Sequence, residues 1–251
     1  MHDPLYWALA VIAAVLVGMS KGGLPLVGML AVPVLALVTP AVTAAGLLLP
    51  VYVVSDVFGL YAYRHSFDRR NLLILAPAAI LGIGLGWATA SVVTEWVVTG
   101  LVGVIGFAFS LNLLLRHAPD GPARQGRVGP GLFWGAVAGF TSFVSHAGAP
   151  PYQVYVQPQR LDKTVFAGTT TILFAIVNAV KLVPYWALGQ LSSDNLRTAA
   201  MLMLPAAIAV YAGVRLVRVI PQGLFYKLVT WALLLVSLKL LWDAWSQSGM
   251  A

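Results

Sequence analysis

Apolar stretches of near membrane-spanning length follow one another along almost the whole chain. They lie at roughly 5–19, 24–38, 41–62, 72–92, 96–115, 130–145, 149–158, 164–186, 196–214 and 222–244. Hydrophobic residues make up 60% of the 251 residues and charged residues only 9%, a balance that a water-soluble domain does not have. Because a helix needs roughly twenty apolar residues to cross the hydrocarbon of a bilayer, the sequence predicts an all-α polytopic membrane protein.

The residues outside these stretches are too few for a soluble catalytic domain or a nucleic-acid-binding module. The formal net charge of +7 is therefore interpreted as loop charge that sets orientation in the membrane. The chain has no cysteine, which excludes a disulfide framework, a thiolate nucleophile and a sulfur-ligated metal site. We expect no enzymatic activity, no cofactor and no metal. Residues 5–19 follow no basic region and are expected to be mature structure rather than a signal peptide.

Two related phrases interrupt the apolar sequence, 125 positions apart. They are Ser20-Lys21-Gly22-Gly23-Leu24-Pro25 and Ser145-His146-Ala147-Gly148-Ala149-Pro150. At the same or nearly the same offset, Asp56 matches Lys181 and residues 77–80 match residues 205–208. These matches predict a duplicated unit: a first membrane repeat at 1–116 and a second at 129–251. The polar, Pro- and Gly-rich run at 117–128 is expected to be a cytoplasmic linker.

The four segments around the phrases, 5–19, 24–38, 130–145 and 149–158, are shorter than a comfortable crossing. We expect two hairpins of half-helices that each enter and return on one side; ten tilted crossings are the alternative. Placing the N-terminus outside puts the loop cations from Arg64 to Arg218 in the cytoplasm. The sequence therefore predicts two inverted-topology repeats with both termini periplasmic. Each repeat would hold a broken or re-entrant helix pair plus about three transmembrane helices.

The repeated phrases are the first candidate site, because secondary transporters bind substrate at interrupted helices near the bilayer midplane. Glycine permits unusual backbone there, and Pro25 and Pro150 fit the first position of a helix. The remaining candidates act as caps or as anion-facing amide donors: Ser20, Gly22, Gly23, Ser145, Ala147 and Gly148.

Lys21 and His146 hold the same place in the two phrases and together indicate a small oxyanion site. His146 is also expected to carry a coupled proton. The alternatives are that Lys21 is an ordinary positive-inside lysine in a turn, and that His146 is a neutral histidine bonded to a carbonyl.

A polar stripe within an arc of about 100° is expected on the helix at 164–186. It consists of Thr164, Thr171, Asn178, Lys181 and Tyr185. We interpret Thr171 and Asn178 as substrate-binding, and Lys181 with Asp56 as coupling or gating residues, since charges within spans are costly. Snorkelling of Lys181 to the interface is the alternative, and no direct salt bridge between Asp56 and Lys181 is expected. Gln153, one turn from Gln157, is a further candidate to line the path.

These motifs carry a resemblance to a known family. Residues 18–25, 145–151, 167–171, 178–185 and 188–191 together resemble the TauE/SafE sulfite exporter family over nearly the whole chain. The resemblance implies a bacterial inner-membrane secondary transporter that exports a small sulfur-containing anion, such as sulfite or an organosulfonate, by alternating access at a midplane site. The added cations Lys21 and His146, which the commoner family pattern lacks, fit an anion.

Two other functions remain open at this point: an anion channel, and an intramembrane enzyme with Ser145 and His146 as nucleophile and base. The expected partners are the small anion and the lipid bilayer, with a coupled proton and a homodimer as further options. No nucleic acid is expected.

Overall fold

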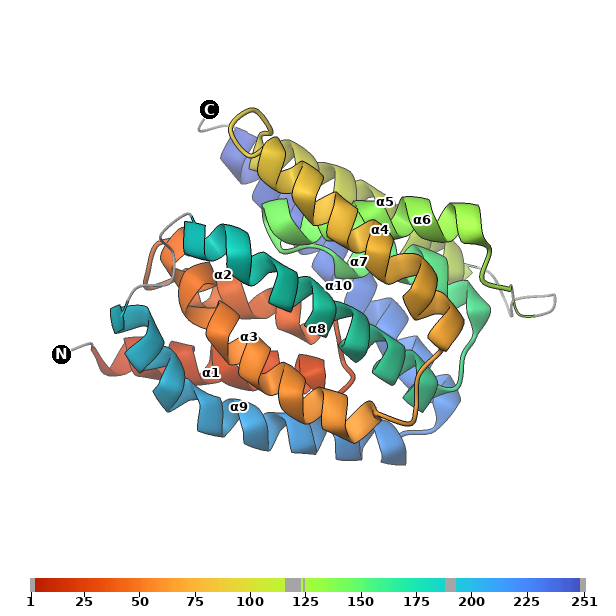
Figure 1. The fold of residues 1–251 in the computed structure, drawn as a ribbon, viewed down its shortest axis with the longest axis horizontal. Coiled ribbons are helices and arrows are strands. Elements are labelled where there is room, and N and C mark those ends of the chain that lie inside the picture. Colours follow the sequence, from red (N-terminus) through yellow and green to blue (C-terminus); the bar gives the residue numbers. More distant parts are fainter. Residues whose placement is uncertain (1–2, 116–122, 124, 188–192, 249–251) are drawn as a thin grey trace. The chain divides into compact units, whose positions relative to one another are not determined.

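The secondary structure of the chain is helical in the computed structural model, which describes residues 3–115, 123, 125–187 and 193–248 (Figure 1). The elements are α1 (Pro4–Lys21), η1 (Val27–Leu30), α2 (Ala31–Leu35), α3 (Ala41–Tyr63), α4 (Arg69–Ala88), α5 (Glu95–Leu115), α6 (Val128–Ser145), α7 (Ala149–Val156), η2 (Gln157–Gln159), α8 (Lys163–Ala187), α9 (Ser193–Val219) and α10 (Gln222–Ser248). No strand occurs in these described ranges, which confirms the predicted all-α class.

Eight of the described helices are long and apolar enough to cross a membrane: α1, α3, α4, α5, α6, α8, α9 and α10. This supports the prediction of a multi-pass membrane protein. The short elements η1, α2 and α7, with four, five and eight residues, are too short to cross.

The expectation that 5–19 and 130–145 are half-length segments is wrong. α1 and α6 have 18 residues each, which is about 27 Å at 1.5 Å per residue. The apolar pattern ends at the first polar residue, whereas the helical hydrogen bonds of α1 continue through Ser20 and Lys21. Each long helix is then followed by short helical pieces, so a break does occur after each repeated phrase.

The chain divides into two compact units, which we describe separately. Unit 1 consists of Met1–Phe67 and Lys163–Ile220, and unit 2 of Asp68–Asp162 and Pro221–Ala251. Each unit therefore contains helices from both halves of the sequence. The repeats at 1–116 and 129–251 and their inversion stay predictions, and most of the linker at 117–128 lies outside the described residues.

In unit 1, α1 lies along α9, and α3 packs against α8 and α9 (Figure 1). The helices approach closely because glycines face backbone. A Cβ atom on Gly18 would lie 2.1 Å from the Ala206 carbonyl oxygen, and one on Gly22 would lie 2.6 Å from Gly213 Cα. Such contacts between small residues hold helices together where lipid supplies no hydrophobic driving force.

In unit 2, glycines also allow α4 and α6 to pack closely, and α5 packs against α10. A Cβ atom on Gly82 of α4 would lie 2.0 Å from the Ala136 carbonyl oxygen. One on Gly139 of α6 would lie 2.0 Å from the Ala79 carbonyl oxygen. Each of the two helices therefore has a glycine that faces the backbone of the other.

The chain passes between the units three times, and two of these connections are fastened by side chains. In unit 1, Lys163 Nζ donates to the Arg218 carbonyl oxygen at 2.8 Å and to the Ile220 carbonyl oxygen. In unit 2, Tyr226 Oη donates to the Leu161 carbonyl oxygen at 2.7 Å. The connections at 162/163 and 220/221 are thus tied to each other on either side.

Gly82→Ala is expected to destabilise the protein, because the added methyl group meets backbone that cannot turn away. Overpacking of this kind costs about 1–3 kcal/mol in the free energy of unfolding. Gly84 on the same helix is the matched control, since its Cβ position has no neighbour within 4 Å. Gly84→Ala should leave the stability unchanged or raise it by up to about 1 kcal/mol. Thermal unfolding of the purified variants in detergent measures both, and equal melting temperatures would contradict the close packing of α4 on α6.

Candidate functional site

The charged side chains that are buried among the described residues number three, and all of them belong to unit 1. Lys21 of α1, Asp56 of α3 and Lys181 of α8 expose 4%, 4% and 3% of their surface. Ionisable groups inside membrane spans are energetically costly and are therefore candidates for function. Three helices far apart in sequence thus bring their buried charges into one unit.

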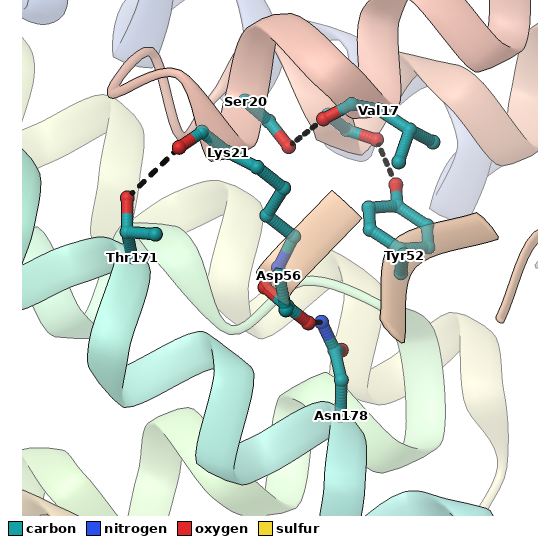
Figure 2. Close-up of polar contacts among 8 residues, drawn as sticks. Val17, Ser20, Lys21, Tyr52, Asp56, Thr171 and Asn178 are labelled. Carbon is teal, nitrogen blue, oxygen red and sulfur yellow. Dashed lines mark hydrogen bonds and ion pairs between the residues drawn. The ribbon is translucent and has the colours of Figure 1, made fainter. Parts of the chain in front are cut away.

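Lys21 and Asp56 form a buried ion pair (Figure 2). Lys21 Nζ lies 2.7 Å from Asp56 Oδ1, and Asn178 Nδ2 donates a hydrogen bond of 2.8 Å to Asp56 Oδ2. The ring of Tyr52 lies beside the ammonium group, with its centroid 5.2 Å from Lys21 Nζ. Both oxygens of the carboxylate are therefore held, one by a cation from α1 and the other by an amide from α8.

Lys181 adds a second cation to this group. Its Nζ lies 5.5 Å from the ring centroid of Tyr185. Lys181 follows Asn178 by three residues on α8, so the two side chains share one face of that helix. We call Lys21, Asp56, Asn178 and Lys181 the charge cluster. With its ionisable groups charged, it holds two ammonium groups and one carboxylate, a net charge of +1. Ammonium groups form strong hydrogen bonds with anionic oxygens, so a buried cluster that contains two lysines is suited to a negatively charged ligand.

The first repeated phrase ends α1 in a Schellman motif. The Leu24 amide donates to the Met19 carbonyl oxygen at 3.3 Å and the Gly23 amide to the Ser20 carbonyl oxygen at 3.2 Å. Gly23 has φ = 111°, which is why a glycine is needed there. The motif stops α1 directly after Lys21, which is the last residue of the helix.

Side chains of α3 and α8 bind the carbonyl groups at this helix end. Thr171 Oγ1 donates to the Lys21 carbonyl oxygen at 3.3 Å, and Tyr63 Oη donates to the Gly22 carbonyl oxygen at 2.6 Å. The last carbonyls of a helix have no partner within the helix, so these bonds compensate for the break. They also fix the backbone of Lys21 relative to Asp56 and Asn178 (Figure 2).

The predicted caps and free amides at the phrases are not what the structure contains. The amides of Gly22, Gly23 and Ala147 donate to carbonyl oxygens of their own helices. Ser20 Oγ and Ser145 Oγ also donate backwards, to the carbonyl oxygens of Val17 and Thr141. A turn of hydrogen bonds follows each helix end, so these donors are used before the next helix begins. The substrate-binding role of these residues stays a prediction.

The two prolines also differ from expectation and from each other. Pro150 lies in the first turn of α7, near its predicted place. Pro25 lies in a turn two residues before η1 and does not begin a helix.

The second phrase breaks its helix differently and lies in unit 2. His146 follows the end of α6 and has the left-handed backbone conformation, with φ = 54°. Thr141 Oγ1 donates to the Ala147 carbonyl oxygen at 3.0 Å and so crosses the break. Lys21 lies inside its helix and His146 outside, and therefore the two are not structurally equivalent. The roles of His146 and of the buried Gly148, and the convergence of Lys21 with His146, stay predictions.

The predicted polar stripe on α8 faces the interior along most of its length. Thr171, Asn178, Lys181 and Tyr185 are buried, whereas Thr164 is partly exposed. Lys181 does not snorkel, since only 3% of its surface is exposed. Gln153, the candidate on α7, is fully buried in unit 2.

The ion pair between Lys21 and Asp56 was missed by the sequence analysis. Asp56 is the one acidic residue in the middle of the apolar segment 41–62. A carboxylate at such a position needs a cation, and three lysines of unit 1 adjoin or lie within its apolar segments: Lys21, Lys163 and Lys181. This charge requirement was a signal that could have linked Asp56 to these lysines.

Comparison with protein families gives one match over most of the chain. The family model described as sulfite exporter TauE/SafE matches residues 8–240. No curated protein and no solved structure matches the chain.

Asp56→Asn is expected to destabilise the protein, because it leaves the buried ammonium group of Lys21 without its carboxylate. Removal of one partner from a buried ion pair costs about 3–5 kcal/mol. Adding Lys21→Met to Asp56→Asn should restore part of the loss, since the double variant buries one cation fewer. The comparison is thermal unfolding in the absence of added anions.

The matched control is Asp243→Asn, which removes the i,i+4 pair of Asp243 with Lys239, whose side chains are 30% and 31% exposed. Its effect should be about 0–1 kcal/mol. Equal losses for the Asp56 and Asp243 variants would contradict the buried pair.

Proposed function

We propose that this chain, which belongs to the sulfite exporter TauE/SafE family, exports a small sulfur-containing anion, such as sulfite or an organosulfonate, by secondary transport with alternating access. The observation that carries this proposal is the charge cluster. Its two ammonium groups and single carboxylate are buried among apolar helices, and an anion is the ligand that neutralises them. The family supports a membrane anion exporter, and the cluster supplies the cations that such a substrate requires.

In this mechanism Lys21 and Lys181 bind the oxygens of the anion, and Asn178 and Thr171 orient the two helices that hold them. Asp56 acts as the internal counter-ion of Lys21. Its carboxylate keeps Lys21 in place when no substrate is bound, at a separation of 2.7 Å. A charge-assisted hydrogen bond from either lysine contributes about 1.5–3 kcal/mol to holding the anion.

Charge balance supports a site for a coupled proton. A singly charged anion neutralises the +1 cluster with Asp56 still ionised. A doubly charged anion would leave a net charge of −1 unless one proton entered with it. Asp56 is the carboxylate of the cluster and is our first candidate to accept that proton, with His146 of unit 2 as the second.

For the protein as a whole we propose a bacterial inner-membrane location with both termini periplasmic. Inverted repeats fit this function, because alternating access arises when one repeat moves against the other around a central site. Assembly as a homodimer is compatible with the proposal and is not required by it.

Lys181→Met is expected to lower substrate flux about tenfold or more in proteoliposomes, because a lost charge-assisted hydrogen bond corresponds to at least this factor in affinity. Methionine keeps the length of the side chain and removes its charge. The measurement is counterflow of radiolabelled sulfite or methanesulfonate, which a channel does not support. Lys21→Met should lower flux similarly.

Lys239→Met is the control, since Lys239 pairs with Asp243 on α10 outside the charge cluster. It should transport at the wild-type rate. Wild-type flux in both cluster variants would show that the cluster does not bind the substrate, and flux without counterflow would favour a channel.

Topology can be tested cleanly, because the natural chain has no cysteine. A single cysteine introduced by Asp120→Cys is expected to react with a membrane-impermeant maleimide only after the inner membrane is opened. A cysteine introduced by Ser248→Cys should react from the periplasm in intact spheroplasts. The reverse pattern would show that both termini are cytoplasmic.

A further inference from the structure

Unit 2 contains a second group of buried polar side chains, which the charge cluster of unit 1 does not include. Gln153 and Ser237 are fully buried, and Gln157 and Thr230 are buried to more than nine-tenths. We call these four residues the polar seam. None of them is charged, and none of the buried charged residues among the described part of the chain belongs to unit 2.

The register of the polar seam follows from two contacts. Gln157 Nε2 donates to Thr230 Oγ1 at 2.7 Å. At the other end, a Cβ atom on Gly106 of α5 would lie 2.3 Å from Ser237 Oγ and 3.3 Å from Pro150 Cβ, so Ser237 lies near the start of α7. The segment from 150 to 157 therefore runs antiparallel to the segment from 230 to 237, each about two helical turns long.

Gln153 lies between these two contacts on the same face of α7, because residues three and four apart share a helix face. Its amide nitrogen and amide oxygen have no hydrogen-bond partner among the residues that the structure describes. The same holds for Gln157 Oε1 and Ser237 Oγ. Buried polar groups are nearly always hydrogen-bonded, so these atoms have hydrogen-bonding capacity that a bound ligand or water molecules would use.

We propose that the polar seam is an uncharged binding site for the oxygens of a singly charged oxyanion; this inference rests on the proposed function. The Gln153 amide group offers two N–H donors and Ser237 offers one O–H donor, while the Gln oxygens accept from a protonated oxygen or a water molecule. Uncharged amide and hydroxyl groups can therefore donate hydrogen bonds to the oxygens of an anion without a positively charged side chain beside it.

The absence of a buried cation in the described part of unit 2 sets the charge of the ligand. The energy of burying an ion rises with the square of its charge, so a dianion costs about four times as much as a monoanion. The polar seam therefore takes hydrogensulfite or a sulfonate and discriminates against sulfate. Gly106 leaves the room for Ser237, because any side chain there would meet its hydroxyl group.

The test compares Gln153→Met with Gln159→Met in the purified full-length protein. Methionine has the length of glutamine without its hydrogen-bonding groups. Gln159 is the matched control: it exchanges hydrogen bonds with Asn71 at 2.8 and 3.2 Å and donates to the Tyr155 carbonyl oxygen. The readouts are melting temperature without anion and binding of methanesulfonate and of sulfate by equilibrium dialysis.

Gln153→Met should keep or raise the melting temperature without anion, because no hydrogen bond is lost, and should weaken methanesulfonate binding about tenfold. Gln159→Met should lower the melting temperature and leave the affinity unchanged. Wild-type protein should bind methanesulfonate at least tenfold more tightly than sulfate. Ser237→Ala should weaken methanesulfonate binding several-fold with little change in melting temperature, whereas Ser110→Ala, whose hydroxyl group bonds within α5, should change neither.

Unchanged methanesulfonate binding in both Gln153→Met and Ser237→Ala would overturn the polar seam as a ligand site and assign its partners to water, while leaving the proposed function standing. Equal binding of sulfate would overturn the charge preference. Lack of binding of every sulfur oxyanion to the wild-type protein would instead contradict the proposed function itself, and this inference with it.

Discussion

The ion pair between Lys21 and Asp56 is the constraint on which unit 1 depends. Burying these two charges is unfavourable unless each finds a partner, and they meet at 2.7 Å only when α1 ends directly after Lys21 and α3 passes that end. Several contacts hold the ion pair in place. The Schellman motif at Gly23 ends α1, and Thr171 and Tyr63 donate hydrogen bonds to the carbonyl oxygens at that end. The Asn178 amide donates to the Asp56 carboxylate. Lys181 is the third buried charged side chain in the described part of this unit.

The two units place polar groups in different chemical settings. Unit 1 buries charge, and its ligand preference follows from an electrostatic imbalance among ionised groups. Unit 2 buries uncharged amide and hydroxyl groups, and its preference follows from unused hydrogen-bonding capacity. The proposed binding of a small oxyanion therefore rests on different residues and a different kind of interaction in each unit.

Much of the fold was predictable, because apolar periodicity in a bilayer admits few structures. The predicted segments correspond to α3, α4, α5, α8, α9 and α10, and the stripe from Thr171 to Tyr185 faces inward as its spacing requires. The lengths of α1 and α6 were not predictable from hydropathy. Ser20 and Lys21 end the apolar pattern, but the backbone hydrogen bonds of α1 continue through them.

The two repeated phrases have similar sequences but different structures. A shift of one residue in the helix end places Lys21 inside its helix and His146 beyond it. Partners such as Asp56 for Lys21 depend on how helices pack, which local sequence does not encode.

Hydrogen bonds hold the chain in place where it passes from one unit to the other. The chain connects unit 1 to unit 2 at three places. In unit 1, Lys163 Nζ, directly after one connection, donates to the Arg218 carbonyl oxygen, close to another. In unit 2, Tyr226 Oη donates to the Leu161 carbonyl oxygen and joins the other sides of the same two connections. The connection at 67/68 is also held on both sides. In unit 1 a Cβ atom on Gly168 of α8 would lie 1.8 Å from the Ser66 carbonyl oxygen, and in unit 2 Asn71 exchanges hydrogen bonds with Gln159. Each of the three connections therefore leaves a unit from a segment that is anchored within that unit.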